Sequence, residues 1–356
     1  MSDQATGGAK KGFDVGGQAV IEGVMMRSPR SYVVVCRLPD GRITLRESPW
    51  KSLWERLRVL RKPFLRGAVV LLEALQNGLK ALSFSADQQA KAEAVAAGEE
   101  GDEAPVELSS AAIAGTIAFS VALGFLFFGA LPHALAWAAG QGLGVDLKEG
   151  TSLAFHAIDG VIKASIFIGY LWAISRMKEI RRVFMYHGAE HKSIHAYEHG
   201  DELTVENARR YPKLHPRCGT SFLFLVILVS VVVFALVFPL VPVLVENRIL
   251  NQVLYVLIKL PLMFPIAGLA YEVQRLSARW PDHPLVKVVI WPGLALQLIT
   301  TVEPDDDMLE VALLSLRKVL WREEVGADHA VEESGLVQTF ESFDEAAAAV
   351  ALPVAA

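Results

Sequence analysis

Hydrophobic residues in this chain are gathered into a few long runs rather than spread evenly. Leu108 to Val145 contains no Lys, Arg, Asp or Glu, and Gly219 to Val245 is a second uncharged run rich in Val, Leu and Phe. Each run exceeds the ~20 residues that a helix needs to cross the hydrocarbon core of a bilayer. Thr151 to Ser175 and Ile249 to Tyr271 are also long enough, although charged residues interrupt both. The pattern predicts four transmembrane helices.

The N-terminal region has a different pattern. GGQAVIEGVMMRSP, from Gly16 to Pro29, contains the glycines and the proline of a folded loop. YVVVCRLPDGRITLRE follows, with two β-branched runs around a Pro39-Asp40-Gly41 turn, and predicts a β-hairpin. After Pro49, basic and apolar residues alternate at helical spacing, which is typical of an amphipathic helix lying at the membrane interface.

The predicted fold class is therefore a mainly α-helical, polytopic membrane protein with amphipathic interfacial helices and a small N-terminal β-hairpin. Val288 to Thr301 is too short to cross a bilayer and predicts a re-entrant or interfacial piece. The chain divides into five consecutive parts: a cytoplasmic N-terminal region (1–86), a flexible linker (87–107), a membrane domain (108–301), an amphipathic helix (302–325) and a disordered acidic tail (326–356).

The basic residues predict how the chain lies across the membrane. Of its 34 Lys and Arg, fifteen precede the first span, nine lie between Arg176 and Arg217, and six lie between Arg275 and Arg322. The two loops predicted to lie outside hold one each, Lys148 and Arg248. The positive-inside rule thus predicts a multi-pass protein of the cytoplasmic membrane, with both termini and the His-rich loop 176–218 in the cytoplasm.

That loop carries the strongest candidate for chemistry. YHGAEHKSIHAYEH, which begins at Tyr186, holds four of the nine histidines. At ~100° per residue, a helix gathers four of its polar side chains on one face: His187, His191, His195 and Glu198. His187 to His191 matches H-x-x-E-H, in which two imidazoles one turn apart hold a Zn²⁺ ion. Glu190 between them is the predicted general base, taking a proton from metal-bound water.

A catalytic zinc site needs a third protein ligand, and the predicted topology offers several. HPRCGTSF lies where the third span enters from the cytoplasmic side, and YEVQR lies where the fourth span leaves on that side. His215, Cys218 and Glu272 should therefore approach the histidines at one depth. Glu272 is the preferred third ligand, because two His, a carboxylate and a water form a catalytic set. Cys218 is the alternative, and Cys218 together with His215 would close the shell of a structural metal.

Polar residues elsewhere are weaker candidates. His156, Asp159 and Lys163 share one face of the second span, and ionisable groups within a membrane are candidates for a transport or proton path. The alternative is a structural role, in which Asp159 and Lys163, one turn apart, neutralise each other. Glu22 could add a carboxylate to the metal site, or its loop could simply pack on the membrane domain.

Five blocks of this sequence resemble, in order, those of the bacterial YqhQ family of membrane proteins, which are labelled metal-dependent enzymes. They are GGQAVIEGVMMRSP, YHGAEHKSIHAYE, HPRCGTSF, AYEVQR and PGLALQLITTVEP. The resemblance extends from about Val15 to Arg322, apart from the linker. It implies a cytoplasmic-membrane protein with a metal at the histidine blocks and implies no particular reaction.

The function expected from these observations is that of a zinc-dependent hydrolase acting on a membrane-proximal peptide or a lipid-like ester or amide. Its expected partners are the lipid bilayer and an unknown membrane-proximal substrate or protein. One alternative is a non-enzymatic scaffold or assembly factor with a structural metal, and another is a transporter. The sequence contains no P-loop, Rossmann fingerprint or CxxC pair, which disfavours nucleotide-driven and thiol-redox chemistry. Nothing in it favours binding of nucleic acid.

Overall fold

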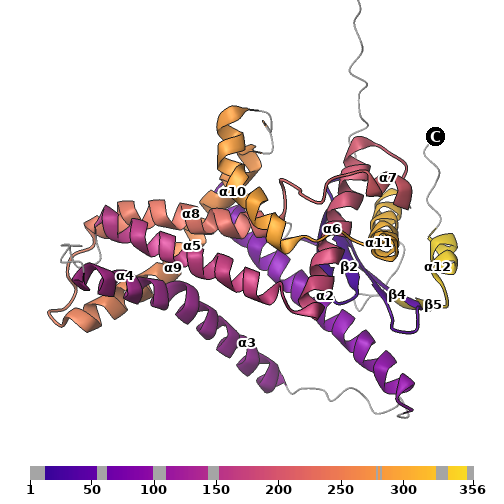
Figure 1. Ribbon diagram of the computed structural model, residues 1–356, viewed down its shortest axis with the longest axis horizontal. Coiled ribbons are helices and arrows are strands. Elements are labelled where there is room, and N and C mark those ends of the chain that lie inside the picture. Colours follow the sequence, from indigo (N-terminus) through magenta and orange to yellow (C-terminus); the bar gives the residue numbers. More distant parts are fainter. Residues whose placement is uncertain are drawn as a thin grey trace, which may run out of the picture.

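Helices make up most of the part of the chain that the structure describes. The computed structural model describes residues 13–53, 62–98, 110–142, 152–277, 280, 283–325 and 336–350. Figure 1 shows two regions, a bundle of long apolar helices and a body built around a β-sheet, with α2 (Leu65–Ala96) reaching from one to the other.

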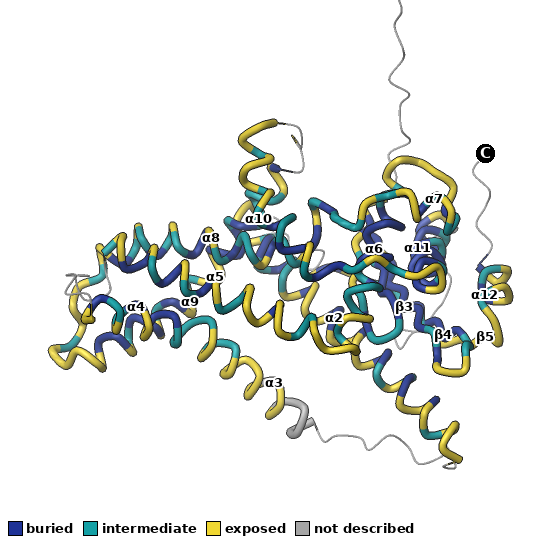
Figure 2. The backbone as a smooth tube through the Cα atoms, viewed as in Figure 1, coloured by how far each residue is buried: buried dark blue, intermediate teal, exposed yellow. Residues whose placement is uncertain are grey.

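Within the described residues, four helical segments are long and apolar enough to cross a membrane, as predicted. They are Ala118–Gly142, Leu153–Ile174, Gly219–Leu240 and Arg248–Ser277. The first segment is formed by α3 (Ser110–Phe125), a π-helical turn η2 (Leu126–Ala130) and α4 (Leu131–Gly142). The second is α5 (Leu153–Ile174). The third consists of α8 (Gly219–Val237) and the short η4 (Phe238–Leu240), and the fourth is α9 (Arg248–Ser277). Many of their apolar side chains stay exposed on the outer sides of the bundle, where lipid would cover them (Figure 2).

The interior of the bundle lies between α8 and α9. Phe222, Phe234, Tyr255 and Ile266 are buried there together. The start of α2 crosses α9 at close range, since a Cβ added to Gly268 would lie 1.9 Å from the carbonyl oxygen of Phe64. Small residues at a crossing let two backbones approach, so this contact fixes α2 against the bundle.

The sheet has five antiparallel strands whose spatial order follows the sequence. The strands are β1 (Gly16–Val20), β2 (Gly23–Arg27), β3 (Ser31–Arg37), β4 (Ile43–Pro49) and β5 (Leu336–Phe340). The predicted hairpin is the β3–β4 pair, and its turn includes Gly41 at a φ of 90°. The segment from Gly16 to Pro29, predicted as a loop, instead contains a second hairpin, β1–β2.

Both faces of the sheet are covered by helices. Val33 and Val35 face α6 (Lys178–His199) and α11 (Asp306–Val325), whereas Tyr32, Val34 and Cys36 face α2. A strand buried on both faces needs apolar residues at every position, which explains the unbroken YVVVC run. The result is a three-layer body of helix, sheet and helix pair.

Two further segments differ from the sequence predictions. The helix α2 continues to Ala96, into the segment predicted as a linker, and Gln89 there donates a hydrogen bond of 2.8 Å to the Arg37 carbonyl. The tail predicted as disordered supplies β5, which pairs with β4, and α12 (Phe343–Ala349). Residues 288–301 lie largely in a single helix, α10 (Pro284–Thr300). The short α7 (Val205–Arg209) follows α6. Residues 99–109 lie outside the described part of the chain.

The chain that leaves α10 crosses α6 at Gly188. The Val302 N–H donates a 2.9 Å hydrogen bond to the Phe184 carbonyl, and a Cβ added to Gly188 would lie 2.2 Å from the Val302 carbonyl oxygen. Only glycine permits this approach, which brings the end of α10 against the histidine helix.

Replacing Gly188 by alanine should therefore destabilise the protein by about 1–3 kcal/mol, because the added methyl group overpacks a rigid backbone contact. The measurement is the melting temperature in detergent, which should fall for Gly188→Ala. Gly169→Ala in α5 is the matched control. A Cβ at Gly169 meets no atom within 4 Å, so this change should leave the melting temperature unchanged or raise it through helix propensity. Equal effects of the two substitutions would contradict the crossing.

Candidate metal centre

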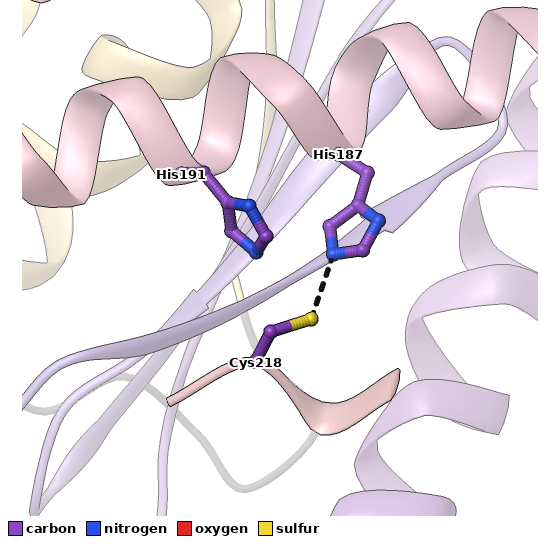
Figure 3. A group of neighbouring side chains, drawn as sticks. All are labelled: His187, His191 and Cys218. Atoms are coloured by element: carbon purple, nitrogen blue, oxygen red, sulfur yellow. Dashed lines mark hydrogen bonds between the residues drawn. The ribbon is translucent and has the colours of Figure 1, made fainter. Parts of the chain in front are cut away.

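The histidine face of α6 meets a cysteine at the start of α8. His187 and His191 lie one turn apart with ring centroids separated by 4.4 Å, and His187 Nε2 lies 3.2 Å from Cys218 Sγ. One donor atom from each of the three residues lies within 4.8 Å of the others. Figure 3 shows both rings pointing from α6 toward the sulfur.

Backbone carbonyls set the orientation of both rings. His187 Nδ1 lies 2.8 Å from the Thr300 carbonyl oxygen, and His191 Nδ1 lies 2.5 Å from that of Lys213. A carbonyl oxygen can only accept, so each Nδ1 carries the proton and each Nε2 keeps its lone pair. Metal-binding histidines are held in this way by their second nitrogen.

The sulfur of Cys218 is fixed from the other side. Cys218 is the N-cap of α8, where its Sγ accepts from the Thr220 backbone N–H at 3.4 Å and lies 3.0 Å from Thr220 Oγ1. The side chain is buried. These contacts hold the sulfur at the first turn of α8, beside His187 Nε2.

Gln297 of α10 positions the segment that carries Cys218. Its Oε1 accepts from the His215 N–H at 2.8 Å, while its Nε2 donates to the His215 carbonyl at 2.8 Å and to Ser221 Oγ at 2.7 Å. The Gln297 side chain is fully buried. Sequence reasoning missed this residue. The available signal was a single amide side chain within the apolar run of α10, which must find partners when buried.

Glu190 lies on the same turns of α6 but points toward the sheet. A Cβ added to Gly17 of β1 would lie 2.6 Å from Glu190 Cγ and 2.7 Å from its Oε1. Burial raises the pKa of Glu190, while nearby His187, His215 and the Gly17 N–H act in the opposite direction. A carboxylate whose pKa is shifted toward neutrality is a better general base at pH 7.

The next turn of α6 forms a second group of possible ligands. His195, Glu198 and His215 each offer a donor atom within 4.8 Å of the others. Burial lowers the pKa of His195 to about 4, and it also lowers the pKa of His191 and His215. Histidines with lowered pKa values are neutral at pH 7 and present lone pairs rather than positive charge.

Comparison with known proteins places the chain in a family. The model of a family described as a protein of unknown function, DUF1385, matches residues 62–322. The Bacillus subtilis (strain 168) protein titled "Uncharacterized protein YqhQ" is 34% identical over 312 residues, which cover 86% of this chain and 92% of that protein. The chain belongs to the DUF1385 family. No solved structure matches it. The resemblance to YqhQ predicted from the sequence blocks is thereby confirmed.

In this DUF1385 protein, two carboxylates form ion pairs with arginines, although the sequence predicted that they would approach the metal. Glu272, the preferred third ligand, forms an ion pair with Arg66 of α2, with Oε1 2.6 Å from Arg66 Nε. Glu22 lies in the β1–β2 turn and pairs with Arg182 of α6. Each arginine is at least 160 residues away in sequence from its partner, so spacing along the chain gave no sign of either pair. Of the two proposed third ligands, Cys218 is the one placed beside the histidines.

The polar face of the second span is part of a larger network within the membrane region. Asp159 Oδ2 lies 3.5 Å from Lys163 Nζ and 3.0 Å from Lys259 Nζ, and Lys259 Nζ lies 3.0 Å from His133 Nδ1. His156 is buried, and neither of its ring nitrogens has a hydrogen-bond partner among the described residues. Sequence analysis identified three members of this network but did not place Lys259 and His133 beside them.

Another feature of this DUF1385 protein is a small, open cavity of about 20 Å³ between α8, α9 and α10. Pro216, Ser221 and Gln274 line it beside the Cys218 segment, and Leu225, Leu228 and Val289 line it farther along α8 and α10. Gln274 also donates to the Cys218 carbonyl at 3.3 Å. A cavity of this size holds about one water molecule.

Proposed function

We propose that this DUF1385 protein is a zinc-dependent hydrolase of the cytoplasmic membrane, with its metal held by His187, His191 and Cys218. The observation that carries the proposal is the convergence of these three donors, with both imidazoles already oriented by backbone carbonyls. Preoriented neutral imidazoles and a cysteine sulfur form a donor set suited to zinc.

The spacing of the donors fits the size of the ion. Donors at zinc bond lengths of about 2.0–2.3 Å lie roughly 3.3–3.7 Å apart in a tetrahedron. The 3.2 Å between His187 Nε2 and Cys218 Sγ is close to that range. Among the described residues, His215 belongs to the second ligand group and does not join these three donors. Three protein ligands leave one tetrahedral position for water, as in catalytic rather than structural zinc sites.

Glu190 is the proposed general base. Zinc, when bound, lowers the pKa of a coordinated water to about 7. The buried carboxylate of Glu190 interacts electrostatically with His187 and His215. Burial raises its pKa, which makes it a better proton acceptor at neutral pH. The Glu190 carboxylate packs closely against Gly17, and Gln297 holds the Cys218 segment, so neither group has to be ordered during the reaction.

The basic residues near the spans favour a cytoplasmic location for this site and for both termini. A site at the membrane surface suits a substrate that is itself membrane-proximal, either a peptide bond or a lipid-like ester or amide.

The test combines zinc content with hydrolysis in detergent-purified protein. Glu190→Gln should keep the zinc content of the wild type but lose hydrolysis by roughly 10²–10⁴-fold, because it removes only the proton acceptor. His187→Ala/His191→Ala should lose one zinc per chain together with activity. Zinc is measured by mass spectrometry, and hydrolysis with a chromogenic fatty-acyl ester and a fluorogenic peptide mixture as probes.

Glu272→Gln is the matched control, since the Glu272 carboxylate pairs with Arg66 and should affect neither zinc nor hydrolysis directly. Loss of zinc from Glu190→Gln as complete as from the double histidine variant would make Glu190 a ligand and remove this mechanism. Zinc-loaded wild type that cleaves neither probe would contradict hydrolase activity and favour the scaffold alternative.

A proton-coupled carrier is the second candidate function, and the membrane network favours it. Two lysines contact the single carboxylate of Asp159, and the buried His156 has no hydrogen-bond partner among the described residues. Ionisable groups are expensive within a membrane and commonly mark proton paths.

If the network carries protons, wild-type protein in liposomes loaded with a pH-sensitive dye should dissipate an imposed pH gradient, and Asp159→Asn should abolish that flux. The change keeps the shape of the side chain and removes its charge. Two results would exclude this function for the network. One is a wild-type proton flux no greater than that of empty liposomes, and the other is an unchanged flux in Asp159→Asn.

A further inference from the structure

The ligand-bearing face of α6 does not end with the first metal group. One turn beyond His191 on α6, the side chains of His195 and Glu198 face His215. His215 lies in the segment that leads into α8. The His195 and His215 ring centroids are 4.6 Å apart, and His215 Nε2 lies 3.4 Å from Glu198 Oε2. Two imidazoles and a carboxylate form the His₂Glu donor set of catalytic zinc enzymes.

His195 is oriented by a backbone carbonyl, as the two histidines of the first group are. His195 Nε2 lies 2.9 Å from the Leu214 carbonyl oxygen, next to the Lys213 carbonyl that orients His191. Nε2 therefore donates, and Nδ1 of His195 keeps its lone pair. Two consecutive carbonyls of one loop thus fix one histidine from each group.

Arg217 binds one oxygen of the Glu198 carboxylate and leaves the other oxygen toward His215. Its guanidinium contacts Glu198 Oε1, and the other oxygen, Oε2, faces His215. His215 Nδ1 accepts from the Arg217 N–H at 3.3 Å, so Nε2 carries the proton and donates to Glu198 Oε2 at 3.4 Å. A bound ion would take the place of this proton, and the 3.4 Å separation lies within the roughly 3.3–3.7 Å expected between two ligands of one tetrahedral ion. His215 is buried, whereas Glu198 lies at the exposed edge of the group.

The two groups adjoin each other. The ring centroids of His191 and His215 are 5.6 Å apart, and Glu190 interacts electrostatically with His187 of the first group and His215 of the second. Enzymes that hydrolyse with two metals place the ions about 3.5–4 Å apart, so that both act on one substrate.

We propose that His195, Glu198 and His215 bind a second divalent ion of the zinc class, so that the centre is binuclear. The inference deepens the proposed function and rests on it, because the second ion would serve the same hydrolytic site. The second group has no sulfur ligand, whereas the first does, and this difference separates the two sites experimentally.

The test uses full-length protein in detergent, stripped with chelator and reloaded with Zn²⁺ or Co²⁺. Wild type should bind two ions per chain, and its Co²⁺ form should show the near-ultraviolet charge-transfer band of a thiolate ligand. His195→Ala/Glu198→Gln should bind one ion and keep that band. His187→Ala/His191→Ala should also bind one ion but lose the band.

His199→Ala is the matched control, because His199 lies on the same helix, is exposed and belongs to neither group; it should bind two ions. A wild type with one ion, an intact band and no loss in His195→Ala/Glu198→Gln would overturn the second site and leave the first. If the wild type bound one ion, showed no charge-transfer band and lost the ion only in His195→Ala/Glu198→Gln, the first site would be overturned and the second would remain. Melting curves of the metal-free variants check that each is folded.

Discussion

The proposed centre depends on the contact between the histidine helix α6 and the segment that begins α8. Two carbonyl oxygens of this segment, those of Lys213 and Leu214, bind imidazoles of α6, and the Thr300 carbonyl at the end of α10 binds a third imidazole. The His215 carbonyl accepts from Gln297 and so ties the segment to α10. Carbonyls are fixed by the fold rather than by side-chain rotamers, so the rings are oriented before any ligand arrives. If this contact were lost, Cys218 and His215 would move away from α6, and neither ligand group would exist.

The rest of the molecule holds that contact between the sheet-containing body and the helix bundle. The three-layer body buries one side of α6 against the sheet and α11, while α5 and α8 extend from the contact into the bundle. The crossing of Gly188 by the chain after α10 adds a third element to the same place. A site supported by membrane helices and by a packed sheet is rigid on both sides, which suits chemistry that needs fixed ligands.

Local patterns in the sequence predicted the elements and their faces. Long apolar runs identified the four candidate spans, the unbroken YVVVC identified a strand, and the spacing of His187 and His191 placed both on one helical face. Partners of polar side chains were not predictable in the same way. Glu272 was expected at the metal but pairs with Arg66, and Gln297 binds a segment 82 residues away. Periodicity encodes which way a side chain points, whereas its partner depends on how distant elements dock.

The same limit explains the sheet. A hairpin between neighbouring strands follows from turn residues, but β5 joins β4 from the far end of the chain, and nothing local to Leu336–Phe340 indicates that pairing. The proposed centre requires that Cys218 bind zinc together with histidines of α6, and X-ray absorption at the zinc edge detects such a bond. The wild-type spectrum should contain a zinc–sulfur distance of about 2.3 Å that disappears in Cys218→Ser. A first shell of nitrogen and oxygen alone, or a sulfur distance that persists in Cys218→Ser, would show that Cys218 is not a zinc ligand.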